Sequence, residues 1–347
     1  MRIRRSFPII AAVLLVAAAV ALVVVLRKHA PPEAARLLPG ADGFVYVNLQ
    51  WMRRANLLGE LPAVPHDPEY EQFIQQTGFQ FERDLEEVAF AIHYSAPAVQ
   101  PRFSEVFVGK IHGERLRAYL AKLASSTENY RSVEVYNIPL EGRTLRVGVL
   151  GPDTVAASNV DDPQVIQGII NRSRKLASPF AGPLLLRQYY KHVPFASLAW
   201  GILKINPSAE SPKGAPGGWS SWFSQPAVLL TSLRYLREVH LRAVAFAGNE
   251  QEAKNVADRA SGYLSLFHSA ETAAGAQGSD PDVKALFDSL QIEQQKDRVV
   301  LTATVPAGFI RKALAEAPVA ATPAEHPQQT PGAAPQSPEK PRHEKVR

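Results

Sequence analysis

An uncharged apolar run near the N-terminus constrains this chain more than any other feature of its sequence. No charged residue occurs from Phe7 to Leu26, and only Pro8 interrupts a run of alanine, valine, leucine and isoleucine. About twenty helical residues, rising about 1.5 Å each, span roughly 30 Å, which is the thickness of a bilayer's hydrocarbon core. Pro8 falls in the first turn, where a helix tolerates proline. The run predicts a transmembrane helix over residues 7–26, in contact with the lipid bilayer.

A cleaved signal peptide is the alternative interpretation of the same run. Ala19-Val20-Ala21 fits a small-x-small cleavage site, and cleavage there would release a secreted soluble protein. It would also leave the apolar residues from Leu22 to Leu26 at the new N-terminus. The apolar part of a signal peptide usually extends over only about 7–15 residues. We therefore favour an uncleaved signal-anchor.

The charges on either side of the run predict its orientation. Three arginines and the terminal amine precede it, whereas Arg27 and Lys28 follow it. Since the more basic flank stays in the cytoplasm, residues 1–6 are expected there and the bulk of the chain is expected to be periplasmic or extracellular. The chain has no cysteine, so its exported part folds without disulfides. This favours a bacterial envelope, with the anchor in the inner membrane.

The formal net charge of +5 does not indicate a nucleic-acid-binding face. Residues 1–28 hold five basic residues and no acidic one, and the tail from Pro318 holds four basic and three acidic residues. The middle of the chain is left with 29 basic and 30 acidic residues. Because the surplus lies beside the membrane run and in the tail, we expect no nucleic-acid partner.

Composition divides the exported part into a linker, two lobes and a tail. The tail is rich in proline and has no aromatic residue, so it is expected to be disordered. A stretch rich in proline, glycine and serine is expected to form a flexible loop within the second lobe. The predicted boundaries are a juxtamembrane linker over residues 27–36, lobe 1 over 37–195, lobe 2 over 196–317 with the loop at 206–226, and the tail over 318–347.

Capping and periodicity predict the helices of the two lobes. Asp67-Pro68, Asp162-Pro163 and Asp280-Pro281 each place a capping carboxylate before a proline, and apolar residues at helical spacing follow each pair. Two further apolar stripes, Leu116 to Leu123 and Ala253 to Phe267, predict helices, the second capped by Asn249.

Alternating and apolar segments between these helices predict strands. They comprise residues 88–95, 104–111, 132–138, 144–150, 154–158, 197–205, 239–247 and 298–305. Short strands joined by turns, with helices set apart from them, are typical of an α+β fold with mostly antiparallel sheet and flanking helices. A strand–turn–helix pattern over residues 106–123 recurs over residues 241–264, which suggests that the two packed lobes are related.

An aromatic cluster lies inside the predicted flexible loop. Trp219, Trp222 and Phe223 occur within the stretch GAPGGWSSWFSQP, where no helix or strand period sets their spacing. Two interpretations remain open. The rings either pack back onto the sheet as a plug, or they form a contact with the membrane or a partner. We favour the plug.

The sequence carries no strong motif for catalysis. GxSxG, GxxxxGK[ST], GxGxxG after a strand and HExxH are all absent, and the nine histidines do not fall at metal-ligand spacing on one helix. No catalytic residue, metal site or cofactor is therefore predicted. His93, in a strand among alanines, is interpreted as structural. The polar aromatic patch from Tyr189 to His192 is interpreted as a packing contact between the lobes.

Two short segments of the lobes resemble a known class of proteins. The segment from Leu38 to Leu49 (LPGADGFVYVNL) and the run Val299 to Pro306 (VVLTATVP) resemble the opening and closing strands of uncharacterised, single-pass, membrane-anchored bacterial envelope proteins. The resemblance implies a location and a fold, and it carries no functional residues. We expect a non-enzymatic binding or scaffolding module for an envelope partner. The alternative is an envelope hydrolase whose site is assembled from residues distant in sequence.

Overall fold

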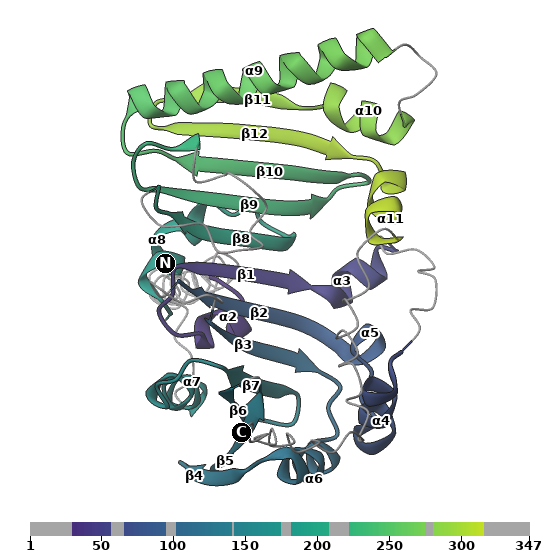
Figure 1. Cartoon of the computed structure of the whole chain (residues 1–347), viewed down its shortest axis with the longest axis vertical. Helices are drawn as coiled ribbons and strands as arrows, with labels where there is room; N and C mark the ends of the chain where they lie inside the picture. Colours follow the sequence, from purple (N-terminus) through teal and green to yellow (C-terminus); the bar gives the residue numbers. More distant parts are fainter. Residues whose placement is uncertain are drawn as a thin grey trace, which may run out of the picture.

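A single antiparallel sheet organises the molecule (Figure 1). The computed structural model describes residues 30–56, 66–94, 102–140, 142–174, 182–207, 222–274 and 280–315. The strand order in the 12-stranded sheet is β11-β12-β10-β9-β8-β1-β2-β3-β7-β6-β5-β4. The strands are β1 (Gly43–Asn48), β2 (Leu85–His93), β3 (Arg102–Gly109), β4 (Ser126–Tyr130), β5 (Val133–Leu140), β6 (Arg143–Val149), β7 (Thr154–Ser158), β8 (Ser197–Ile205), β9 (Ala227–Tyr235), β10 (Val239–Phe246), β11 (Gln291–Gln295) and β12 (Arg298–Val305).

The two predicted lobes are the two halves of this one sheet. Residues 37–195 supply β1 to β7, and residues 196–317 supply β8 to β12. The halves join where β1 pairs with β8, with Phe44 opposite Ile202 and Tyr46 opposite Trp200. The α+β class and the mostly antiparallel sheet are confirmed. The structure differs from separate packed lobes because this pairing continues the sheet across the predicted boundary.

The two halves have related connectivities, although the first returns through four strands and the second through two. In the first, three consecutive strands (β1, β2 and β3) lead into helix α6 (Gly113–Leu123), and the chain returns from the sheet edge until β7 pairs with β3. In the second, β8, β9 and β10 lead into α9 (Glu250–Ala274), and the chain returns from the opposite edge until β12 pairs with β10. The repeated pattern over residues 106–123 and 241–264 therefore corresponds to β3–α6 and β10–α9.

The predicted Asp-Pro caps are present. Asp67 accepts a hydrogen bond from the Tyr70 N–H (2.7 Å) at the start of α4 (Pro68–Thr77). Asp280 accepts one from the Asp282 N–H (2.9 Å) before α10 (Pro281–Asp288). Asp162 accepts one from the Gln164 N–H (2.8 Å), and α7 (Gln164–Arg174) begins one residue later than expected. Asn249 caps α9 through the Glu252 N–H.

The other helices are α2 (Glu33–Leu37), α3 (Leu49–Arg54), α5 (Phe81–Asp84), α8 (Leu184–Tyr189), the 3₁₀ helix η1 (Tyr190–His192) and α11 (Ala307–Ala315).

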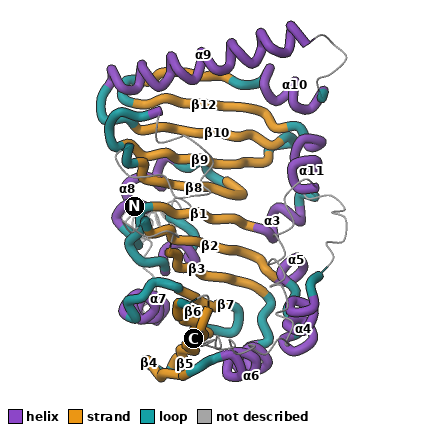
Figure 2. The backbone as a smooth tube through the Cα atoms, viewed as in Figure 1, coloured by secondary structure: helices purple, strands orange, loops and turns teal. Residues whose placement is uncertain are grey.

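One face of the sheet, which we call the core face, packs under α2, α7 and α8. Phe44, Ala91, Ile202 and Leu230 point to this side and are almost fully buried. Ile169 of α7 is fully buried in the same cluster, so the core runs through both halves of the sheet. Figure 2 shows the helices around the margins of the strands.

The opposite face is covered by helices at its two ends, and also over part of β1, β2 and β3, where Phe73 of α4 and Phe81 of α5 pack. Near β12, Val256 of α9 packs in a cluster with Ala245 and Val299. Near β5, Leu120 of α6 packs in a cluster with Tyr136 and Val147. The strand pairing shows that these strand residues point to the side of the sheet opposite to the core face. Helices α6 and α9 therefore lie on the same side of the sheet.

Several predicted segments lie outside the described residues. They include the transmembrane helix over residues 7–26 and the tail over residues 318–347. Among the helices that the structure describes, none combines the length and the apolar character needed to cross a bilayer. The predicted linker over residues 27–36 ends earlier than expected. Its last residues begin α2, whose Ala34 and Ala35 are buried, and so short an alanine-rich helix carries no periodic signal.

Candidate functional site

The middle of the second sheet face is a mostly apolar surface with Thr231 at its centre, and none of the helices described covers it; we call it the open face. Its apolar side chains alternate with those of the core face along six adjacent strands and the neighbouring β3. All of them are half-buried. They are Val45, Ile92, Phe103, Ala199, Leu203, Leu233, Leu241, Ala243 and Leu301.

Cross-strand pairing brings these side chains together. Leu233 lies opposite both Ala199 and Leu241, and Ala243 lies opposite Leu301. From β2 to β12 the face crosses five strand spacings, or about 24 Å at about 4.8 Å each. Contiguous apolar surface of this kind marks binding sites in soluble domains, whereas single exposed apolar residues do not.

One carboxyl group lies at the margin of the open face. Glu105 on β3 stands between Phe90 and Ala157 on the neighbouring strands, and Phe103 and Phe107 of its own strand point to the same side. Burial raises the pKa of Glu105 to about 7. The group can therefore gain or lose a proton near neutral pH. Sequence reasoning missed both Glu105 and the open face, because the alternating sequence pattern of a strand is the same whether its apolar side is covered or exposed.

The predicted aromatic loop residues take different positions. Phe223 is buried in the cluster that joins α9 to the sheet. Trp222 is half-buried and stacks on Tyr263 of α9, with 5.2 Å between ring centroids. Arg259 donates a hydrogen bond to the Trp222 carbonyl (3.1 Å). Trp219 lies outside the described residues. The two described rings thus pack against α9, away from the centre of the open face.

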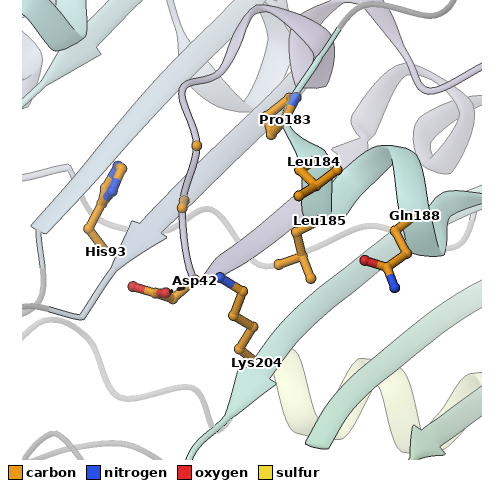
Figure 3. A pocket seen from close by; sticks show the side chains of 9 residues that line it. Asp42, His93, Pro183, Leu184, Leu185, Gln188 and Lys204 are labelled. Carbon is orange, nitrogen blue, oxygen red and sulfur yellow. Dashed lines mark ion pairs between the residues drawn. The ribbon is translucent and has the colours of Figure 1, made fainter.

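A pocket of about 370 Å³ lies on the other side of the sheet, at the end of β2 and β8 (Figure 3). Lys204 reaches Asp42, with 3.5 Å between Nζ and Oδ1, whereas the His93 ring points away from the carboxylate. Asp42 also accepts a hydrogen bond from the Tyr94 N–H (3.1 Å). Burial lowers the pKa of His93, and nearby Asp42 opposes this shift. Asp42 is therefore held by local structural contacts with Lys204 and the Tyr94 N–H.

A serine close to this pocket bears on the hydrolase alternative. Ser104 Oγ lies 3.5 Å from His93 Nε2 and 2.9 Å from Ser158 Oγ. Ser104 is fully buried, so a substrate carbonyl has no access to its hydroxyl. Serine and histidine meet here, but the serine is buried and the His93 ring points away from Asp42, whereas acyl transfer needs an exposed nucleophile and an oriented base. Within the described parts of the chain, no group of three histidine, aspartate or glutamate residues could hold a metal ion.

Comparisons with known proteins give a distant structural likeness. No family model matches the chain, and no curated protein matches it. Two crystal forms of TP0453 align with it at 10% sequence identity. Form III covers 82% of this chain and 98% of its own, with a TM-score of 0.43, and form IV covers 82% and 97%, with a TM-score of 0.42.

Proposed function

We propose that this chain is a non-enzymatic binding module of the bacterial envelope, and that its open face receives an amphipathic helical surface of a partner protein. The observation that carries the proposal is the run of half-buried apolar side chains across the middle of the sheet, from Ile92 on β2 to Leu301 on β12. A folded domain gains free energy by removing such surface from water, at roughly 25 cal/mol per Å².

The chain's own helices indicate which shape fits this surface. The amphipathic helices α6 and α9 pack on the same face at its two ends, through Leu120 and Val256. A further helical surface between them, beside α4 and α5, would meet the same kind of sheet side chains. A helix with its side chains is about 10–12 Å across, so the 24 Å wide face has room for one or two.

A protein helix suits the open face better than a lipid chain does. Sites for small apolar ligands are concave and bury most of the ligand's surface. The open face is broad, and a single acyl chain lying on it would stay in contact with water. A protein surface can cover the whole width and supply a polar rim.

The proposal includes the membrane location predicted from residues 7–26, with residues 1–6 in the cytoplasm and the sheet on the periplasmic side of the inner membrane. The support is the apolar length of that run and the arginines before it. The first described helix, α2, begins at Glu33 and is packed into the core. A folded domain would therefore sit within a few residues of the bilayer surface.

Site-specific photo-crosslinking in living cells tests the open face. A photoreactive residue at Leu241 should give discrete adducts with protein-sized mass increases, because a bound helix would lie within reach of that side chain. Positions Leu236 and Leu184, which are 54% and 74% exposed and lie off the open face, serve as matched controls. The second-site change Leu203→Asp should abolish the adducts, whereas Leu184→Asp should leave them intact.

Three results would count against the proposal. Adducts at Leu241 no stronger than at Leu236 would mean that the open face is unoccupied. Adducts that survive Leu203→Asp would place the partner elsewhere. Lipid-sized mass increases at Leu241 would identify acyl chains as the occupant in place of a protein helix.

A further inference from the structure

A cluster of cationic side chains lies on the core-face side of β9, β10 and β12, away from the open face. Arg234 lies opposite His240, and Arg242 is two residues further along β10 on the same side. Arg298 of β12 lies opposite Phe246. Lys191 and His192 of η1 complete the group, which we call the basic cluster.

Several contacts tie the basic cluster together. Arg242 Nη1 donates a hydrogen bond to the His192 carbonyl (3.3 Å). The His192 ring lies 4.9 Å from the Phe246 ring, measured between centroids. The Arg298 guanidinium lies over the same Phe246 ring, 5.3 Å from its centroid. Arg242 therefore reaches the backbone of His192, whereas the His192 ring and Arg298 meet at Phe246.

Carboxylates do little to neutralise this cluster. In the described part of the chain its single ion pair is exposed and joins Arg298 Nε to Asp297 Oδ1 at 3.6 Å. Glu293 on β11 lies opposite Val300 on the same side, and its carboxylate accepts a hydrogen bond from Gln295. Burial lowers the pKa of Arg242, and the other charges that act on it are Arg298 and Arg234. Burial also lowers the pKa of His192. The charges of Arg298, Lys191 and Arg242 lower it further.

Some cations elsewhere in the described chain lie beside acids. Arg102 pairs with Asp161, and Lys312 pairs with both Asp280 and Asp282. Gathering several cations without such partners costs free energy, since like charges repel. A bound anion would offset that cost.

We propose that the basic cluster is a binding site for a phosphate-bearing anion. Arginine forks donate paired hydrogen bonds to phosphate oxygens, and a phosphate monoester carries a charge of about −1.5 to −2 near pH 7. Arg242, Arg298 and the η1 turn gather around His192, with Arg234 further along the strands, so they suit a compact multivalent anion better than a long polyanion, which needs a longer stripe of charge. Lys191 is exposed and can close over the ligand.

Thermal unfolding of the full chain in nanodiscs, at constant ionic strength, tests the site and separates two sources of phosphate. One arm adds inorganic phosphate to phosphatidylcholine nanodiscs. The other replaces phosphatidylcholine with phosphatidylglycerol and adds no phosphate. The unfolding midpoint of the wild type should rise in at least one arm, and the responding arm identifies free phosphate or a lipid headgroup.

The double variant Arg242→Gln/Arg298→Gln should lose the response, and the phosphate concentration for half the maximal rise should increase about tenfold or more. Arg117→Gln on α6, whose partner is Glu114, is the matched control and should respond like the wild type. If the double variant fails to fold, Arg234→Gln, which removes a cation from the rim, should give a smaller loss. No rise in either arm, or an equal rise in the variants, would overturn the proposal.

Discussion

At the scale of single residues, Glu105 at the margin of the open face makes the stability of the folded protein depend on pH. Its pKa in the folded protein is raised to about 7 from a usual value of 4.5 because the carboxylate is poorly solvated among apolar neighbours. The folded state therefore holds the proton more tightly than the unfolded state does. This contribution to stability is fully present below about pH 4.5 and is lost as the pH rises through about 7.

The change Glu105→Gln keeps the shape and removes the charge. We expect the variant to be more stable than the wild type at pH 8, by up to about 3 kcal/mol. The gain should shrink steadily as the pH falls towards 5. Urea unfolding between pH 5 and pH 8.5 measures the difference. A stability difference independent of pH would show that Glu105 is solvated in the folded protein.

At the scale of elements, the caps were readable from the sequence and can be tested singly. Asp162→Ala removes the acceptor for the Gln164 N–H at the start of α7, whose Ile169 and Ile170 lie in the core. We expect the free energy of unfolding to fall by about 0.5–2 kcal/mol. Asp162→Asn retains a capping oxygen and should cost much less. Equal losses for the two variants would indicate a role for the charge beyond capping.

Other elements escaped prediction for physical reasons. The edge strands β4 (STENY) and β11 (QIEQQ) are polar and mostly exposed, so they carry no apolar alternation, and only pairing with β5 and β12 makes them strands. Strand β9 begins at Ala227, directly after the segment 206–226 that was interpreted as a flexible loop, and it was not among the predicted strands, although its Leu230 is fully buried. Helix α2 is five residues long, which is too short for a helical period to appear.

At the scale of the whole molecule, the two halves should unfold together. They share the β1–β8 pairing, and Tyr46 of one half stacks on Trp200 of the other, with 5.5 Å between ring centroids. Separating the halves would expose this part of the core. We expect a single urea transition in which tryptophan fluorescence and far-ultraviolet circular dichroism coincide. Two separate transitions would mean that the halves are independent folding units.

The candidate sites also belong to this scale, and the sequence could not reveal them. The open face gathers Val45, Leu203 and Leu301 from strands far apart in the chain, and the basic cluster gathers Lys191, Arg242 and Arg298. Alternation predicts which side chains share a face of one strand, but strand order decides which of them meet. The aromatic loop was visible in the sequence, and the structure packs its described rings against α9.

Chemical accessibility in native membranes tests the central claim, that the open face is an occupied binding surface, most directly. The chain has no cysteine, so single cysteines introduced by Leu241→Cys and Leu236→Cys report on one position each. We expect maleimide to modify Leu241→Cys slowly in native membranes and quickly in the purified protein, because purification removes the partner. Leu236→Cys, in the exposed turn after β9, should react quickly in both. Equal rates for Leu241→Cys in membranes and in the purified protein would contradict the account.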